Sequence, residues 1–174
     1  MIIDGCNVGR SCGFYDPDFV GSARDGFNKL RKTVWGRPLF ARATVTMIQF
    51  FLEKCNDVVT YKPLLMLPEF YVHGGTQQNL FAFNYEMLQE PWVVDYLTLL
   101  PSHTDDDRFL LKHAQNEANR GKEVFIVSLD TFKNHVKTGN VTAEFLRDRV
   151  IRFAWVGGSE IIMCPPEGVD LPGL

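Results

Sequence analysis

The sequence lacks the features that mark zinc-binding, disulfide-rich and membrane proteins. It has four cysteines without a CxxC pair and four scattered histidines, which argues against a zinc site or a disulfide framework. No apolar run is long enough to cross a bilayer, and no signal peptide is visible. We therefore expect reduced thiols, no membrane partner and a cytoplasmic location. The cysteines are Cys6, Cys12, Cys55 and Cys164.

An excess of basic charge, internal repeats and low-complexity segments are missing as well. The net charge is −3, which argues against a strongly basic nucleic-acid binder but does not exclude one, because charge can be uneven along the chain. The 174 residues suit one domain over residues 1–174, with a core covered on two sides. Because the chain opens directly on an apolar segment, we expect its start to be a trimmed or internal boundary.

Segments of strand and helix character alternate along the chain. Residues 1–8 predict a short buried strand that delivers Asp4 onto a turn at Gly5. Further strands are predicted at 58–61, 92–97, 124–128, 151–155 and 160–163. Helices are predicted at 39–55, 76–89, 105–119, 130–137 and 141–149, with a loop at 63–75. This order predicts an α/β fold, in which a mostly parallel central sheet carries helices on both faces and the terminal strands form an antiparallel hairpin at Gly157 and Gly158.

Acidic and amide side chains follow two of these strands and open one helix. In an open parallel sheet, the carboxyl ends of the strands gather on one edge, where ligands bind. Carboxylates gathered there repel one another unless a hard cation such as Mg²⁺ lies between them. The pattern therefore predicts a metal-dependent phosphoryl-transfer site. The residues concerned are Asp4, Asn7, Asp105, Asp106, Asp107 and Asp130.

The spacing of these residues resembles that of the Regnase (MCPIP) type of NYN ribonuclease, a branch of the PIN-like nucleases. Residues 3–8 are similar to the family's IDGSNV opening, and residues 106–112 to its DDRF helix start. Residues 127–133 are similar to its VSND segment, and residues 145–166 follow its pattern at the end. The resemblance covers most of the chain and is specific at the three acidic segments. It is poor over residues 10–38 and 62–102.

This resemblance implies a three-layer PIN-like (NYN) fold and a metal-dependent endoribonuclease that cleaves single-stranded or loop RNA through a Mg²⁺-activated water. Messenger RNA turnover and RNA silencing are the implied settings. A homodimer, or a related NYN or RNA-silencing partner protein, is the implied protein partner. The implied cofactor is Mg²⁺ or Mn²⁺, held by Asp4, Asp106, Asp107 and Asp130. The implied catalytic residues are Asp4, Asn7, Asp107 and Asp130, where Asn7 would orient a water or a phosphate oxygen.

Two departures from the family pattern favour a different function. The family carries a further acid where this chain has Asn134, and several cations where residues 98–103 have none. These changes favour a catalytically weak or inactive PIN-like scaffold or dimerisation domain in an RNA-processing complex. The aromatic-rich segment 70–83 could supply its interface.

Two groups of cations could contact RNA. Arg108, Lys112 and Lys133 flank the predicted metal ligands, where they could hold a phosphate or merely balance the acids. Arg31 and Lys32 belong to the basic stretch 24–37, in which aromatic residues alternate with cations as in sites that stack unpaired bases. The same stretch is also typical of a surface helix with a solvated basic face.

Each acidic group, taken alone, also has a purely structural explanation. Acids after Thr104 stabilise a helix N-terminus, and Asp130 suits an N-cap. Asp4 and Gly5 suit a tight turn, with Asn7 capping the next segment. These explanations do not account for the match of all three groups to one family's spacing in chain order.

Overall fold

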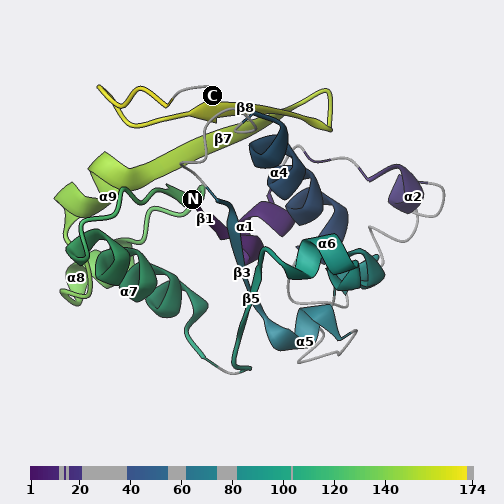
Figure 1. Ribbon diagram of the computed structural model, residues 1–174, viewed down its shortest axis with the longest axis horizontal. Coiled ribbons are helices and arrows are strands. Elements are labelled where there is room, and N and C mark those ends of the chain that lie inside the picture. The colour runs from purple at the N-terminus through teal and green to yellow at the C-terminus, as the bar shows by residue number, and fades with distance from the viewer. Residues whose placement is uncertain are drawn as a thin grey trace.

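A six-stranded sheet forms the centre of the computed structural model, in the order β5-β3-β1-β6-β7-β8 (Figure 1). All neighbouring strands are parallel except β7 and β8, which form an antiparallel hairpin. The strands are β1 (Ile2–Asp4), β3 (Leu64–Pro68), β5 (Leu97–Leu100), β6 (Ile126–Val127), β7 (Val150–Val156) and β8 (Glu160–Cys164). The structure describes residues 1–11, 14, 16–20, 39–54, 62–73, 82–102 and 104–171, without the side chains of residues 19 and 20.

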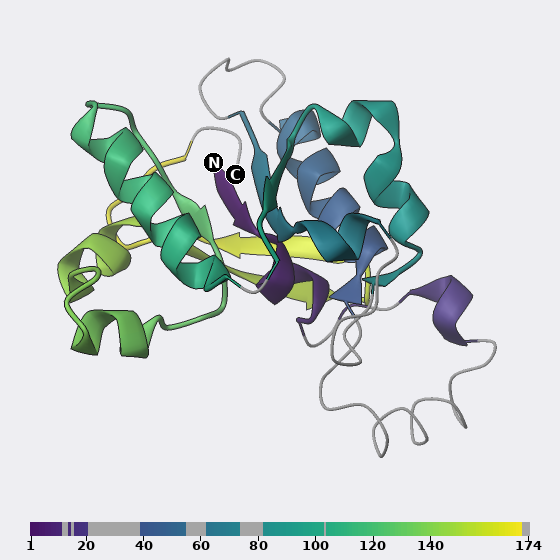
Figure 2. The ribbon, with the colours of Figure 1, turned by 90° about the horizontal axis from the view of Figure 1, so that it is seen from below.

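Helices cover both faces of this sheet, and a small parallel pair, β2 (Leu39–Phe40) with β4 (Ala82–Phe83), lies apart from it. Turning the molecule by 90° shows α7 and α8 on one side of the strands and α4 on the other (Figure 2). The helices are α1 (Gly5–Gly9), α2 (Pro17–Val20), α4 (Ala41–Lys54), α5 (Glu69–Val72), the 3-10 helix η1 (Tyr85–Gln89), α6 (Pro91–Val94), α7 (Asp106–Asn119), α8 (Lys133–Lys137) and α9 (Ala143–Arg149). Among the described residues, no helix is long and apolar enough to cross a membrane.

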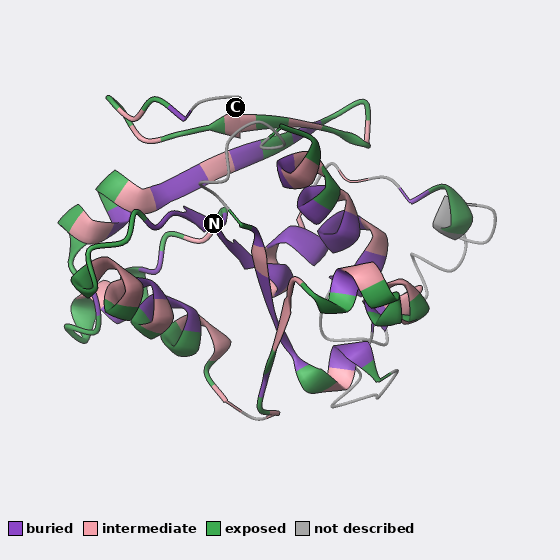
Figure 3. Ribbon diagram, in the orientation of Figure 1, coloured by how far each residue is buried: buried purple, intermediate pink, exposed green. Residues whose placement is uncertain are grey.

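The buried residues, purple in Figure 3, form two cores. They are separate because successive side chains of a strand point to opposite faces of the sheet. Ile3 and Leu65 belong to the core that packs under α4, whereas Ile2 and Met66 face the core under α7. The sheet is therefore the middle of three layers, as predicted.

Parallel pairing brings distant segments to one edge of the sheet. Ile3 of β1 pairs with Val127 of β6, so the residues that follow each strand leave the sheet side by side. Helix α7 packs against β1 and β3, and its N-terminal turn lies over the same edge. This topology positions the site described below.

Several predicted elements are wrong, and local chemistry explains each. Strand β1 stops at Asp4 because that side chain caps α1 instead of continuing the strand to position 8. The strand predicted at 92–97 is helix α6, since Pro91 at its start fixes a helical φ angle, and the strand follows at β5. The loop predicted at 63–75 contains β3, whose apolar run is typical of a strand buried on both faces.

The segment between positions 58 and 89 also departs from prediction where the structure describes it. In the region of the predicted helix 76–89, the described residues form β4 and η1, separated by Asn84 with a left-handed φ of 56°. The strand predicted at 58–61 lies outside the described residues. By contrast, the predicted hairpin turn at Gly157 and Gly158 is confirmed, with φ angles of 61° and 89°.

Gly5 lies where α1 crosses closely over β3, and this contact yields a prediction. A Cβ at position 5 would come within 2.7 Å of the Met66 carbonyl oxygen, which is backbone and cannot easily move. We expect Gly5→Ala to lower the free energy of unfolding by about 1–3 kcal/mol in urea titrations. The comparison variant is Gly121→Ala, whose Cβ meets nothing within 4 Å but whose φ is +77°, so backbone strain alone acts there. A free energy of unfolding of Gly5→Ala equal to that of the wild type would contradict the close contact between α1 and β3 at this position.

Candidate active site

A cavity of about 430 Å³ opens at the carboxyl edge of the sheet. It lies between α1, the start of α7 and the loop after β6. The structure brings together here all the predicted metal residues and Asn7. The described lining residues are Asp4, Cys6, Asn7, Arg10, Ser11, Asp106, Asp107, Leu129 and Asp130.

Asp4 is the most buried carboxylate of the cavity, with a relative exposure of 5%. Its Oδ1 accepts the Asn7 backbone N–H at 3.0 Å, and its Oδ2 accepts the Ser128 hydroxyl at 2.8 Å. Burial nevertheless raises the pKa of Asp4 to about 7, and the negative charges of Asp107 and Asp106 add to the rise. The two hydrogen bonds hold the carboxylate in one orientation but do not neutralise it.

Asn7 ties α1 to the loop after β6. Its Oδ1 accepts the Leu129 backbone N–H at 2.7 Å, so the side-chain oxygen is engaged within the protein. The side-chain NH₂ group, which only donates hydrogen bonds, is the part of Asn7 suited to an anionic oxygen. The role predicted for Asn7 toward a phosphate oxygen is compatible with this geometry and stays a prediction.

Asp106 and Asp107 begin α7, directly after the N-cap Asp105, whose side chain accepts the Arg108 backbone N–H at 3.1 Å. Burial is the main cause that raises the pKa of Asp107 to about 6, and repulsion from Asp106 and Asp130 adds to the rise. Burial and the charge of Asp106 raise the pKa of the Cys6 thiol well above its usual range. Cys6 therefore stays protonated and donates to Asp106, which makes it a poor nucleophile.

Asp130 belongs to a turn rather than to a helix cap. Its Oδ1 accepts the Phe132 backbone N–H at 2.6 Å, and its own N–H donates to the Ser128 hydroxyl at 3.0 Å. The N-cap of α8 is Phe132, which has a left-handed φ of 49° and no side-chain cap, so the predicted helix start at Asp130 is wrong. Arg152 of β7 braces this turn by donating from Nη1 to the carbonyl oxygens of Ser128 and Asp130.

Sequence reasoning missed His135, which lies on α8 beneath the start of α7. Its Nε2 is 3.6 Å from Oδ1 of Asp105 and 3.9 Å from Oδ2 of Asp107. One ligand atom from each of these three residues falls within 4.8 Å of the others, a spacing that could hold a metal ion. The side chain is buried, and Nδ1 lies 3.3 Å from the Asn140 amide. The only available signal in the sequence was its place next to Asn134, where the resembled family carries an acid.

Arg10 was also missed, because it opens the segment where the family resemblance is poor. Among the described residues that line the cavity, it alone carries positive charge. Its guanidinium stacks 5.3 Å from the ring centroid of Tyr71, which holds the cation beside the carboxylates. Such a cation can contact a phosphate that enters the cavity.

Of the cations predicted to bind substrate, the three that the structure describes do not line this cavity. Arg108 and Lys112 are exposed on α7 and do not line it. Lys133 lines a second cavity on the other side of the Asp130 turn. Arg31 and Lys32 lie outside the described residues. Asn134 is exposed on α8.

The layers and the strand order together define a three-layer α/β protein with a mostly parallel central sheet. Two structures of the nuclear protein-only RNase P 2 (PRORP2) from Arabidopsis thaliana are similar to it. One matches 95% of this chain and 29% of its own, with a TM-score of 0.55 and 15% identity. The other matches 97% of this chain and 30% of its own, with a TM-score of 0.52 and 17% identity.

These likenesses confirm the predicted fold, and the Regnase-type resemblance stays a prediction. This chain spans less than a third of the length of the RNase P chains it matches. No family model and no curated protein matches the sequence.

The donor set of the cavity fits a hard divalent cation. Carboxylate oxygens are the ligands that Mg²⁺ and Mn²⁺ prefer, and each oxygen has two lone-pair directions, so those of Asp4 can bind a cation while accepting hydrogen bonds. The raised pKa values of Asp4 and Asp107 show that the protein's own groups leave this negative charge uncompensated. Asp4, Asp106, Asp107 and Asp130 are the residues that would hold the cation.

Proposed function

We propose that this protein is a metal-dependent endoribonuclease that hydrolyses single-stranded or loop RNA. The observation that carries the proposal is the convergence of four carboxylates and Arg10 on one cavity of a PIN-like fold. A Mg²⁺ or Mn²⁺ ion bound there would supply Lewis-acid chemistry, lowering the pKa of an attacking water and neutralising charge on the phosphate. Its setting in messenger RNA turnover or silencing, and its cytoplasmic location, stay predictions.

The chain's own residues would position the phosphodiester in this cavity. Arg10 supports the proposal because it can attract a phosphate oxygen to an otherwise negative site. The Asn7 amide can donate a hydrogen bond without adding charge. Ser128 holds Asp4 in place, and Arg152 holds the turn of Asp130, so two ligands from distant strands keep a constant separation.

The test of this proposal is cleavage of an end-labelled single-stranded RNA with Mg²⁺, with Mn²⁺ and with EDTA. We expect internal cuts with either metal, products that carry a 5′-phosphate and a 3′-hydroxyl, and no cuts in EDTA. A well-folded protein that cut RNA with neither metal would refute the nuclease.

We further propose that His135 contributes to cation binding from below α7, in place of the acid absent at position 134. Imidazole nitrogen is a better ligand for Mn²⁺ than for Mg²⁺. We expect His135→Asn to weaken Mn²⁺ binding by about tenfold or more in calorimetric titrations, with a smaller effect on Mg²⁺. The matched control is His113→Asn on α7, which lines neither cavity and should bind both metals as the wild type does. Equal Mn²⁺ affinity in the two variants would restrict His135 to packing.

A non-catalytic scaffold is the second candidate function. The observation that favours it is the edge hairpin of β7 and β8, on which Val156 and Ile162 are exposed apolar residues. Packing of this face of the hairpin against another chain would bury both side chains. The interface predicted at residues 70–83 lies mostly outside the described residues and stays a prediction.

A further inference from the structure

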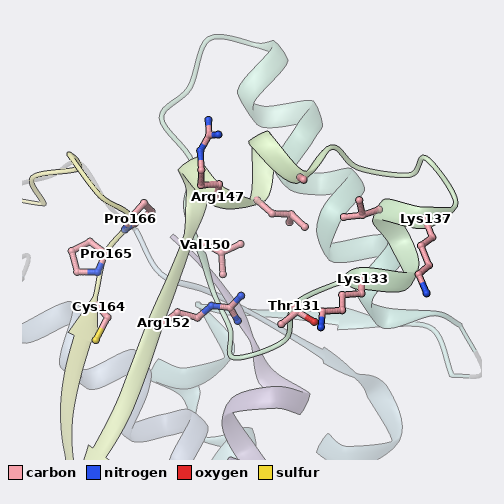
Figure 4. A pocket seen from close by; sticks show the side chains of 12 residues that line it. Thr131, Lys133, Lys137, Arg147, Val150, Arg152, Cys164, Pro165 and Pro166 are labelled. Carbon is pink, nitrogen blue, oxygen red and sulfur yellow. The ribbon is translucent and has the colours of Figure 1, made fainter.

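A second cavity, of about 670 Å³, is lined by Thr131, the residue that follows Asp130 (Figure 4). It is bounded by α8, α9, β7 and the segment that follows β8. Four of its described lining residues are cations and none is an acid. Apolar side chains, among them Val136, Leu146 and Val150, form much of the rest of the lining. The four cations are Lys133, Lys137, Arg147 and Arg152.

The cations of this cavity differ in their partners. Arg147 is exposed and paired with Asp148 at 2.8 Å and with Glu144 at 3.6 Å, so its charge is largely balanced. Within the described part of the chain, Lys133, Lys137 and Arg152 have no ion pair with a carboxylate. Figure 4 shows Lys133 and Arg152 extending toward each other beside Thr131, with Lys137 farther along α8. Positive charge that no carboxylate of the described residues pairs with is thus gathered in the cavity beside the Asp130 turn.

One turn separates this cavity from the carboxylates. Asp130 lines the carboxylate cavity, whereas the next residue, Thr131, lines the basic one. Arg152 spans both environments, because its Nη1 binds the carbonyl oxygens of Ser128 and Asp130 while its side chain lines the basic cavity. A polyanion held at the carboxylates would therefore meet these cations as it passes over the turn.

We propose that the basic cavity binds the RNA strand next to the cleaved bond, with Lys133, Lys137 and Arg152 contacting phosphates and the apolar lining contacting a base. This inference rests on the proposed nuclease function for the identity of the polymer. A single strand carries a phosphate at every nucleotide and exposes its bases, which matches a lining that combines cations with apolar side chains. An acidic peptide would match the cations alone.

The test is RNA binding in EDTA, where cleavage does not interfere, by fluorescence anisotropy over a series of salt concentrations. The double variant Lys133→Ala/Lys137→Ala should bind a labelled single-stranded RNA on the order of tenfold more weakly at low salt. Its slope of log K against log salt should become shallower by about 0.7 for each phosphate that the variant no longer neutralises. Arg152 is left intact because it supports the turn of Asp130.

The matched control is Lys54→Ala/Lys122→Ala, which removes two exposed lysines that line neither cavity. The inference is overturned if the two double variants bind RNA alike. It is also overturned if a polyglutamate peptide or inorganic phosphate at matched charge displaces RNA as well as unlabelled RNA does. A separate cleavage assay distinguishes failure of the strand site from failure of the proposed nuclease function. Lysine-dependent binding without metal-dependent cleavage would refute the nuclease alone, and cleavage with lysine-independent binding would refute only the strand site.

Discussion

Asp107→Asn should abolish RNA cleavage and leave the protein folded. Asp107 lines the carboxylate cavity and faces His135, and its replacement removes one negative ligand without changing the size of the side chain. Loss of metal-centred charge stabilisation amounts to several kcal/mol in the transition state, so we expect a rate loss of about a thousandfold or more. The measurement is single-turnover cleavage of labelled RNA with saturating Mn²⁺, so that weaker cation binding does not by itself explain the loss.

Stability separates a chemical effect of this substitution from a structural one. Because repulsion and burial raise the pKa of Asp107, the neutral amide should leave the melting temperature in EDTA equal to or above that of the wild type. Asp95→Asn, at an exposed position directly after α6 that lines neither cavity, serves as the control and should cleave normally. Full activity of Asp107→Asn would show that Asp107 is not a catalytic metal ligand. The cation would then have to be held by other residues of the carboxylate cavity.

The stability of the metal-free protein should fall as the pH rises from about 4 to 7. The pKa of Asp4 is raised from 3.8 to about 7 and that of Asp107 to about 6. In this interval the folded protein binds more protons than the unfolded chain, so the free energy of unfolding decreases with increasing pH. Asp4 contributes more than Asp107 to this pH dependence, because Asp4 is buried whereas 34% of the Asp107 side chain is exposed. The total loss should be on the order of a few kcal/mol.

Added cation should reverse this loss. As the pH rises above 7 both carboxylates become ionised. A divalent cation that binds only the folded protein then raises the melting temperature by mass action. The experiment compares melting temperatures in EDTA and in Mn²⁺ from pH 5 to pH 8. The Asp107→Asn variant should show a flatter pH profile in EDTA and a smaller shift with Mn²⁺. A wild-type melting temperature that rises with pH in EDTA would contradict the raised pKa values.

Much of the fold could be predicted because its patterns are local. The apolar periodicity of α4, α7 and α9 and the order of strands and helices were enough for a parallel sheet with two helical layers. Errors arose where residue composition opposed the tertiary context. Prolines at both ends of β3 favoured a loop, but burial within the sheet made this segment a strand. The two β-branched residues of α6 favoured a strand, but the proline at the helix start made this segment a helix.

The acidic edge could be anticipated from the sequence, because carboxylates that follow parallel strands converge by topology alone. Other parts of the site depend on side-chain directions across elements that are far apart in the chain. His135 reaches Asp107 from a short helix, Arg152 reaches the Asp130 turn from β7, and Lys133 turns away into a second cavity. No local pattern encodes such contacts, since each requires two backbone segments to be positioned by the packed core before their side chains can meet.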